Sequence, residues 1–456
     1  MKRCRNGMRG WLSLRAAPVV AALAAIATVG LAFSLSGCES NLTDNPASVG
    51  LVNQYFGTAG QAAQVGSIGA TWSTTLDPTT SYFSYTDLTD QGSTAGATPL
   101  NGSFTTSTSG LLDLKLPSGT RTPFGLAGVG GYAVSLPGEG LLVRTGSSSA
   151  DVFGHSPSAL IAATKSAACP AFTSAETFNF IAQGTTNEGD TVVHVAYGSV
   201  EITPVTSGSA DSWSFSNFTM YDLSGNSLSP SAIPDATCPA TQEGFVLVSP
   251  LSSQAYYPQR ITTGVSPSGL LVIDQGQNFH VVGSSTFSNF DTTPTGPTGL
   301  MGVLKPTTAL NVSDMVGKKY AGFESDPLSN LGTIAVVFGN TSGSGTAITG
   351  GGFPKDDVTQ TPRTDTTLNL GAQSTQTPGL FISVTLTQPD TFAVCAGTPS
   401  GGTDANGNPT CIFHGVAVAG QVNGKYVIYT NINDPTARIN GQATPLAAIN
   451  LALYQQ

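Results

Sequence analysis

The feature that most constrains the fold is a pattern of apolar segments that occurs three times along the chain. Each copy has two short apolar segments joined by turn residues, and a third apolar segment follows after a polar stretch. The paired segments are residues 131–134 with 140–143, 244–248 with 269–273, and 415–418 with 423–428. The third segments begin at residues 157, 297 and 445. Similarity at regular spacing predicts three supersecondary units of one kind.

The local pattern inside these segments predicts strands. Residues 191–197 and 381–386 are rich in β-branched and aromatic residues and are bounded by Gly, Pro or Asn. Asn423 and Gly424 stand at the tip of the third paired segment, where both residues tolerate a positive φ in a tight hairpin. Only 10% of the chain is charged, and amphipathic helices need charged residues on their solvated face. The expected fold class is therefore all-β.

The expected architecture is a tandem array of antiparallel β-meander units, built as small barrels or sandwiches, after an N-terminal signal segment. Closure into a barrel buries one face and removes the edges, with the third apolar segment of each copy as the closing strand; two packed sheets are the alternative. Each unit is expected to have its own core, and residues 361–378 are expected to form a long loop. The predicted boundaries are 1–37 signal peptide, 38–48 tether, 49–167 β unit 1, 168–308 β unit 2 and 309–456 β unit 3.

The N-terminus has the layout of a secretory signal. Five basic residues and no acidic residue occur in the first fifteen positions, and residues 16–35 are almost entirely apolar. The segment ends in Leu35-Ser36-Gly37-Cys38, which resembles the lipobox of bacterial lipoproteins. That resemblance implies that Cys38 is the lipidation site, carrying diacylglycerol with further acylation such as palmitate, and becomes the first residue of the mature protein. An uncleaved membrane anchor is the alternative.

Taken with the Thr- and Gly-rich β body, the layout resembles a proteobacterial family of lipoproteins of unknown function. The resemblance implies a lipid-anchored protein of the cell envelope, and it carries no activity. In enteric bacteria Glu39, rather than Asp, after the lipidated residue would favour the outer membrane over the inner membrane.

Four cysteines remain in the expected mature chain beyond the lipidated one. An even number in an exported protein favours disulfides, and three pairings are open. We favour Cys395–Cys411, which closes a short loop rich in Gly, Pro and Asn, with Cys169–Cys238 as the remaining pair. No Cys-x-x-Cys spacing occurs, so no metal site is expected, and nothing in the sequence indicates a cofactor.

Several short sequence motifs resemble parts of functional sites, but each is better explained as a turn, a loop or a core strand. Residues 154–158 begin like a nucleophile elbow but lack its final Gly. Residues 404–408 place oxygen-bearing side chains at alternate positions, but the acidic ligand that a calcium loop needs does not follow. Tyr82-Phe83-Ser84-Tyr85 puts aromatic residues on both faces of a strand, which favours core packing over a sugar-binding surface.

The overall charge and the absence of a catalytic pattern together set the functional prediction. A net charge of −10 opposes nucleic-acid binding, which needs many phosphates neutralised. We expect a non-enzymatic envelope lipoprotein: a binding or interaction module for a protein or glycan ligand, attached to the membrane by its lipid. A glycan-acting hydrolase and a barrel-type carrier of a small apolar ligand are the alternatives. No catalytic residue is assigned.

Overall fold

The chain divides into Met1–Gly50 and one compact unit, Leu51–Gln456. All residues that the computed structural model describes belong to the second part. They are residues 53–58, 71–87, 100–107, 110–115, 132–144, 160–165, 173–185, 193–207, 210–228, 236–237, 245–248, 261–266, 268–275, 280–282, 286–288, 298–325, 335–338, 346–353, 366–389, 400–403, 409–433, 438–439, 442–443 and 448–456.

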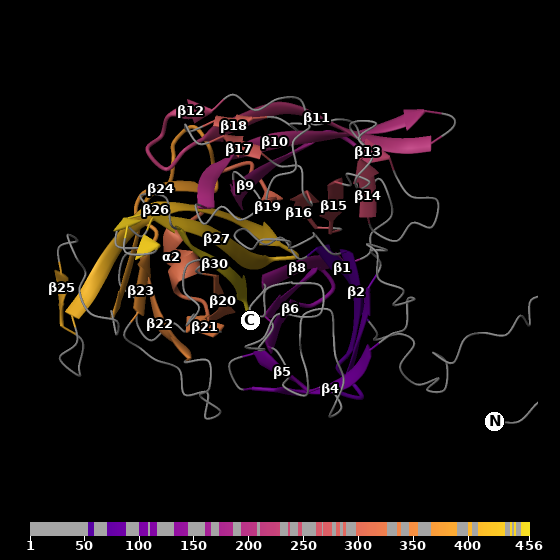
Figure 1. The fold of residues 1–456 in the computed structure, drawn as a ribbon, viewed down its shortest axis with the longest axis horizontal. Helices are drawn as coiled ribbons and strands as arrows, with labels where there is room; N and C mark the ends of the chain where they lie inside the picture. Colours follow the sequence, from indigo (N-terminus) through magenta and orange to yellow (C-terminus); the bar gives the residue numbers. More distant parts are fainter. Residues whose placement is uncertain are drawn as a thin grey trace, which may run out of the picture. The chain divides into compact units, whose positions relative to one another are not determined.

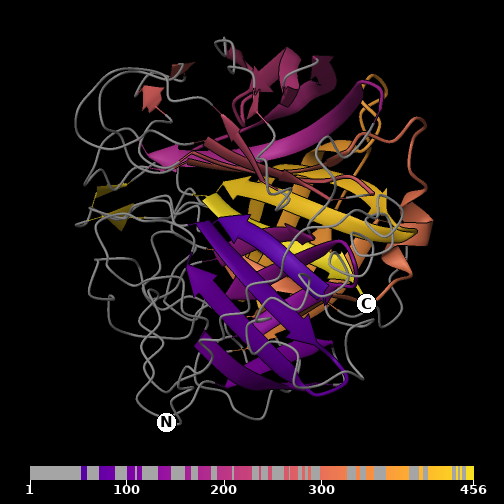
Figure 2. The same cartoon turned by 90° about the vertical axis from the view of Figure 1, so that its right-hand side faces the viewer.

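The first barrel is a closed meander of strands β1 to β8 (Figure 1, indigo to purple). Each strand pairs antiparallel with the next along the chain, and β8 returns to pair with β1, so that Phe56 lies opposite Thr164. Figure 2 shows these strands side by side. The strands are β1 (Asn53–Thr58), β2 (Thr71–Asp77), β3 (Tyr82–Asp87), β4 (Leu100–Thr106), β5 (Leu111–Lys115), β6 (Tyr132–Leu136), β7 (Gly140–Arg144) and β8 (Leu160–Lys165).

The second barrel follows the same plan. The sheet runs from β10 through β9, β19, β16, β15, β14 and β13 to β11, and the pairing of β10 with β11 closes it. Strand β12 pairs antiparallel with one end of β11, and β17 and β18 form a separate two-stranded sheet. The strands are β9 (Glu176–Thr185), β10 (Val193–Ser207), β11 (Ala210–Tyr221), β12 (Ser227–Leu228), β13 (Ala236–Thr237), β14 (Phe245–Val248), β15 (Ile261–Val265), β16 (Leu270–Gln275), β17 (His280–Val282), β18 (Thr286–Ser288) and β19 (Thr298–Leu304).

The third barrel begins after a short helix, α2 (Val312–Val316), whose N-cap Asn311 accepts a hydrogen bond from the Ser313 N–H. The sheet runs from β24 through β23, β22, β21, β20, β30 and β27 to β26, and β24 pairs with β26 to close it. Strand β25 pairs antiparallel with one end of β26, and β28 and β29 form a separate two-stranded sheet. The strands are β20 (Tyr320–Ser325), β21 (Ala335–Phe338), β22 (Ala347–Phe353), β23 (Thr366–Asn369), β24 (Leu380–Pro389), β25 (Ser400–Thr403), β26 (Pro409–Val422), β27 (Lys425–Asn433), β28 (Arg438–Ile439), β29 (Gln442–Ala443) and β30 (Ala448–Gln455).

The all-β fold class, with antiparallel meanders closed into barrels, is confirmed. The third apolar segment of each copy is a closing strand as expected, since β8, β19 and β30 pair with the first strands β1, β9 and β20. The hairpin at Asn423 and Gly424 is also confirmed, with φ of 49° and 74° and Val422 paired with Lys425. The exact unit boundaries stay a prediction.

Two local predictions are wrong. Residues 244–248 and 269–273 do not pair with each other, because β15 lies between them and pairs with both β14 and β16. Its sequence, Ile-Thr-Thr-Gly-Val, is too polar to be found by an apolar pattern. Residues 361–378 were expected to be a loop but contain β23. There Thr366 and Leu368 are buried while Thr367 and Asn369 are partly exposed, which is ordinary strand alternation.

The interior of the third barrel is closely filled. The apolar cluster in this barrel consists of side chains from the inner face of the sheet together with two side chains from α2. The buried members are Met315, Val316, Tyr320, Ile348, Leu368, Leu370, Phe381, Val384, Leu386, Phe413, Ala417, Ala419, Tyr426, Ile428, Ile432, Leu451 and Leu453.

A second apolar cluster lies outside the barrels and joins them. Its buried members come from all three: Leu111, Val134, Leu136, Leu142, Ile181, Tyr197, Leu270, Val303, Ala321, Phe323, Leu380, Val416, Val418, Val422, Val427, Tyr429, Ala452 and Tyr454. We call this set the shared cluster. The prediction that each unit has a core of its own is wrong for this set: Phe323, Val416 and Val427 of the third barrel belong to a cluster that includes side chains of the first and second barrels. On β27 Ile428 points inward while Val427 points outward, and both are fully buried because other barrels cover the outer face.

Candidate functional site

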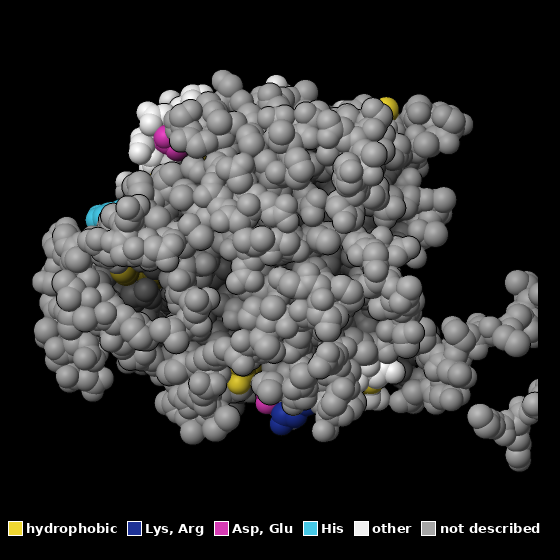
Figure 3. Space-filling model, viewed as in Figure 1, with side chains coloured by type: hydrophobic (Ala, Val, Ile, Leu, Met, Phe, Trp, Pro, Cys, Tyr) yellow, Lys and Arg dark blue, Asp and Glu magenta, His cyan; other side chains and the backbone are white. Residues whose placement is uncertain are grey.

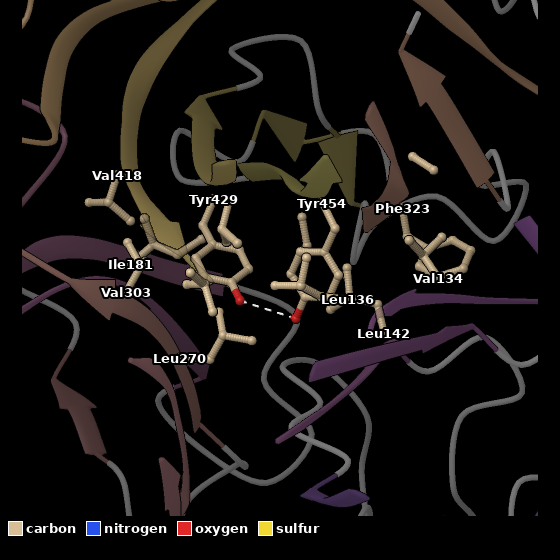
Figure 4. Close-up of a cluster of buried hydrophobic side chains, with 14 of the residues drawn as sticks. Val134, Leu136, Leu142, Ile181, Leu270, Val303, Phe323, Val418, Tyr429 and Tyr454 are labelled. Carbon is tan, nitrogen blue, oxygen red and sulfur yellow. Dashed lines mark hydrogen bonds between the residues drawn. The ribbon is translucent and has the colours of Figure 1, made fainter. Parts of the chain in front are cut away.

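The junction between the barrels is where the described polar groups of greatest chemical interest lie. Figure 4 shows the shared cluster, with Tyr429 and Tyr454 facing each other among aliphatic side chains from the other barrels. The two phenol oxygens lie 3.3 Å apart, and the rings meet edge to face with centroids 6.4 Å apart. Both side chains are fully buried. Burial raises the pKa of Tyr429 and of Tyr454 above the ordinary value of a tyrosine, so both stay neutral.

A third buried tyrosine comes from the first barrel. The Tyr55 hydroxyl lies 3.2 Å from the Ser135 Oγ, and Tyr55 is also fully buried. Desolvation is the main cause that raises the pKa of Tyr55, and the nearby negative charge of Glu139 raises it further. None of these phenols is therefore suited to act as a base near neutral pH.

An amide from the third barrel reaches into the second barrel. Asn431 on β27 is fully buried, and its Nδ2 donates to the carbonyl oxygens of Ala196 at 2.9 Å and Ala182 at 3.1 Å. Ala182 on β9 and Ala196 on β10 lie opposite each other in the ladder of the second barrel. One side chain therefore bridges two neighbouring strands of another barrel.

A second amide makes the opposite connection. Asn179 on β9 is fully buried, and its Nδ2 donates to the carbonyl oxygen of Pro378 at 2.8 Å, in the turn before β24. The adjacent Gly379 has a φ of 81°, and a Cβ there would meet the Ala419 carbonyl oxygen at 2.4 Å. Only glycine fits this close approach between the turn and its surroundings.

The first and second barrels meet through a carboxylate. Glu139, in the turn between β6 and β7, is 5% exposed. Its two oxygens accept from the Ser268 N–H at 3.0 Å and the Ser268 hydroxyl at 2.9 Å. Ser268 lies in the corresponding turn between β15 and β16. Two hairpin turns from different barrels are thus joined by hydrogen bonds to a charged group, which are stronger than neutral ones.

These groups are engaged in holding barrels together. Among the described residues, no group of three or more His, Cys, Asp or Glu side chains is placed to hold a metal ion. On the face shown in Figure 3, the charged side chains of the described residues lie at separate points and form no single patch. No helix in the described ranges is long and apolar enough to cross a membrane.

Most residues singled out from the sequence lie outside the described residues. This holds for Cys38, Cys169, Cys238 and Cys395, and for the strings at 154–158 and 404–408. Cys411 lies on β26, opposite Gln388 and Ser400, but its side chain is not described. Lipidation and both disulfides therefore stay predictions.

Sequence reasoning did not identify the junction residues. Asn431 and Thr430 are polar residues inside the otherwise apolar run from Tyr426 to Ile432, and this was the available signal. A fully buried amide in a strand needs a partner from outside that strand. Of the aromatic run, Phe83 is fully buried, whereas Tyr82 is partly exposed and donates to Asn101 Oδ1 at 2.7 Å.

No protein-family model matches the sequence, and no curated protein matches it. Among solved structures, two variants of transferrin binding protein B from Haemophilus parasuis align with it, at 10% and 8% sequence identity. The alignments cover 89% of this chain and 76% of theirs, with TM-scores of 0.27 and 0.26. At these scores the likeness carries no inference about function.

Proposed function

We propose that this chain is a lipid-anchored protein of the cell envelope that acts as a non-enzymatic binding module. The observation that supports it is the junction, where one apolar cluster and three sets of hydrogen bonds join the barrels. A body joined in this way holds its described strands and short turns in fixed relative positions, which suits recognition of a protein or glycan surface. Units 49–167, 168–308 and 309–456 would each supply one part of that surface.

The filled interior of the third barrel bears on the carrier alternative. A carrier of a small apolar ligand needs an open lumen of several hundred Å3. Here inward side chains such as Phe381, Tyr426 and Leu453 are fully or almost fully buried against one another, with Met315 of α2 packed among them. This packing favours a structural role for the third barrel over transport.

The hydrolase alternative needs two carboxylates able to reach a substrate. Two carboxylates of the described residues are buried, and both are engaged: Asp77 accepts from the Thr79 N–H and the Thr80 hydroxyl. The second, Glu139, has both oxygens engaged by Ser268. Its role in joining barrels favours binding over catalysis at this place.

The lipid anchor is proposed at Cys38, with residues 38–48 as the tether to the first barrel. Two or more acyl chains give stable attachment where one does not, since each buried methylene contributes about 0.8 kcal/mol. We further propose disulfides Cys395–Cys411 and Cys169–Cys238, and attachment to the outer membrane.

The anchor is tested by Cys38→Ser, with Cys4→Ser as the matched control because Cys4 would leave with the signal peptide. In cells fed an alkyne-labelled palmitate analogue, we expect Cys38→Ser to lose the label and to accumulate as precursor, while Cys4→Ser behaves like the native chain. Processing and membrane retention of Cys38→Ser equal to the native chain would show that the anchor is assigned wrongly.

The binding role is tested with purified residues 39–456. We expect saturable binding to an isolated envelope glycan or protein fraction and no release of new reducing ends from the glycans. Turnover of glycan that is lost on Glu139→Gln, with the fold intact, would instead establish the hydrolase alternative.

A further inference from the structure

Two buried asparagines connect the second and third barrels in opposite directions. Asn431 of the third barrel donates to backbone carbonyls of the second, and Asn179 of the second barrel donates to a backbone carbonyl of the third. Both side chains are fully buried. The two connections are reciprocal, and each uses the fixed backbone of the opposite barrel as acceptor.

The placement of the two amides restricts both the position of the third barrel on the second and the angle at which their strands cross. The Asn431 Nδ2 has two hydrogens, and both are used on carbonyls of neighbouring strands, so β27 must cross the β9–β10 pair at Ala182 and Ala196. Asn179 lies three residues before Ala182 on the same strand, which is about 10 Å at 3.3 Å per residue. Two contacts separated by this distance prevent both sliding and rotation of one barrel on the other.

The apolar part of the junction does not supply that restriction. Ile181, Val303 and Val418 are aliphatic members of the shared cluster. Burial of apolar surface is non-directional, so such side chains tolerate several crossing angles. Hydrogen bonds depend steeply on distance and angle, so the two amides favour one arrangement more strongly than these aliphatic contacts do.

Each amide also carries an unfavourable feature. In the described part of the chain, neither the Asn431 Oδ1 nor the Asn179 Oδ1 has a hydrogen-bond partner, although both atoms are buried. An unsatisfied buried oxygen destabilises the folded state, and an apolar residue of similar size would remove it. Stability alone therefore does not explain why an asparagine occupies either position.

We propose that Asn431 and Asn179 form a two-point orientation lock that selects one arrangement of the second and third barrels. The lock contributes specificity of packing more than stability, as a buried polar residue does when it fixes the register of a coiled coil. The proposal concerns packing within the chain and depends neither on the lipid anchor nor on a partner.

The test measures orientation and stability separately. Spin labels are placed at the exposed Ser224 of the second barrel and Gln421 of the third, through a non-canonical amino acid so that the native cysteines are untouched. In the double variant Asn179→Leu/Asn431→Leu we expect the distance distribution to broaden or split, with no loss in the midpoint of urea unfolding. The control Ile428→Val, inside the third barrel, should lower the midpoint and keep the native distance.

A folded double variant with the single native distance would overturn the proposal. So would a lowered midpoint with an unchanged distance, because that result assigns the amides to stability alone. If the double variant does not fold, Asn179→Leu and Asn431→Gln are measured separately. The second keeps the amide but moves it by one methylene, and native distances in both variants would overturn the lock.

Discussion

Alkaline titration gives the sharpest test of how the barrels are packed. Among the described residues, Tyr55, Tyr320, Tyr429 and Tyr454 are fully buried. Desolvation is the largest cause that raises the pKa of each. A buried tyrosine with a raised pKa keeps its proton in the folded chain at a pH where the unfolded chain has lost it. The folded chain then binds more protons, so its stability falls as the pH rises above the unfolded value of about 10.

The magnitude follows from the number of such tyrosines. Each one lowers the free energy of unfolding by about 1.4 kcal/mol per pH unit above pH ~10. The four together give about 5.5 kcal/mol per pH unit, for as long as all four stay protonated in the folded chain. A protein with a typical stability of about 5–15 kcal/mol would therefore unfold within roughly one to three pH units above that point.

The assay follows phenolate absorbance and far-ultraviolet circular dichroism together while the pH is raised. We expect exposed tyrosines to ionise first, and the buried ones to ionise only with the loss of sheet structure, in one cooperative step. The variant Tyr429→Phe/Tyr454→Phe should show about half the pH dependence of stability. Ionisation of all twelve tyrosines with native circular dichroism would refute the reasoning, since it would mean that the phenols of the junction reach water in the folded chain.

Three further predictions concern single contacts. Ile428→Ala should lower the free energy of unfolding by about 2–5 kcal/mol, because it leaves a cavity inside the third barrel; a loss below 1 kcal/mol in chemical denaturation would mean that the interior is loosely packed. Ser268→Ala removes the hydroxyl that donates to Glu139 at 2.9 Å and should cost about 1.5–3 kcal/mol, while Ser224→Ala at an exposed turn should have no effect. Peptide mapping without reductant should recover Cys395 with Cys411 and Cys169 with Cys238, and free thiols at all four positions would contradict the pairing.

The sequence was sufficient to predict the closing strand of each barrel, but it did not reveal several strands in the middle of the second and third sheets. Closing strands such as β30 have both faces buried, so they are continuously apolar and easily found. Strands β15 and β23 are rich in Thr, with Gly264 in β15 and Asn369 in β23, and have too few apolar residues to stand out from turns in composition. Their strand character comes from pairing with neighbours on both sides, which single-sequence patterns do not contain.

The contacts at the junction could not be predicted from the sequence for a different reason. The pattern at Val427, Ile428 and Tyr429 shows that both faces of the strand are buried, but it does not say what covers the outer face. Asn431 could be recognised as an unusual residue in that run, while its acceptors are backbone carbonyls more than two hundred positions away. A carbonyl oxygen has no signature in the sequence, so contacts of this kind emerge only from the structure.

The shared cluster makes each barrel comparable to one subunit of an obligate oligomer whose subunits happen to be linked. The segment that links the second barrel to the third is short and is held in place by hydrogen bonds. The Lys305 N–H donates to the Thr177 carbonyl, and Gln373 is hydrogen-bonded to Leu310. Such a connection gives the joined surfaces a high effective concentration, so docking needs little intrinsic affinity. A barrel excised from the chain would present its apolar outer face to solvent and would be expected to self-associate. Exchange of barrels between related chains would succeed only where the outer faces, more than the barrel interiors, have been kept compatible.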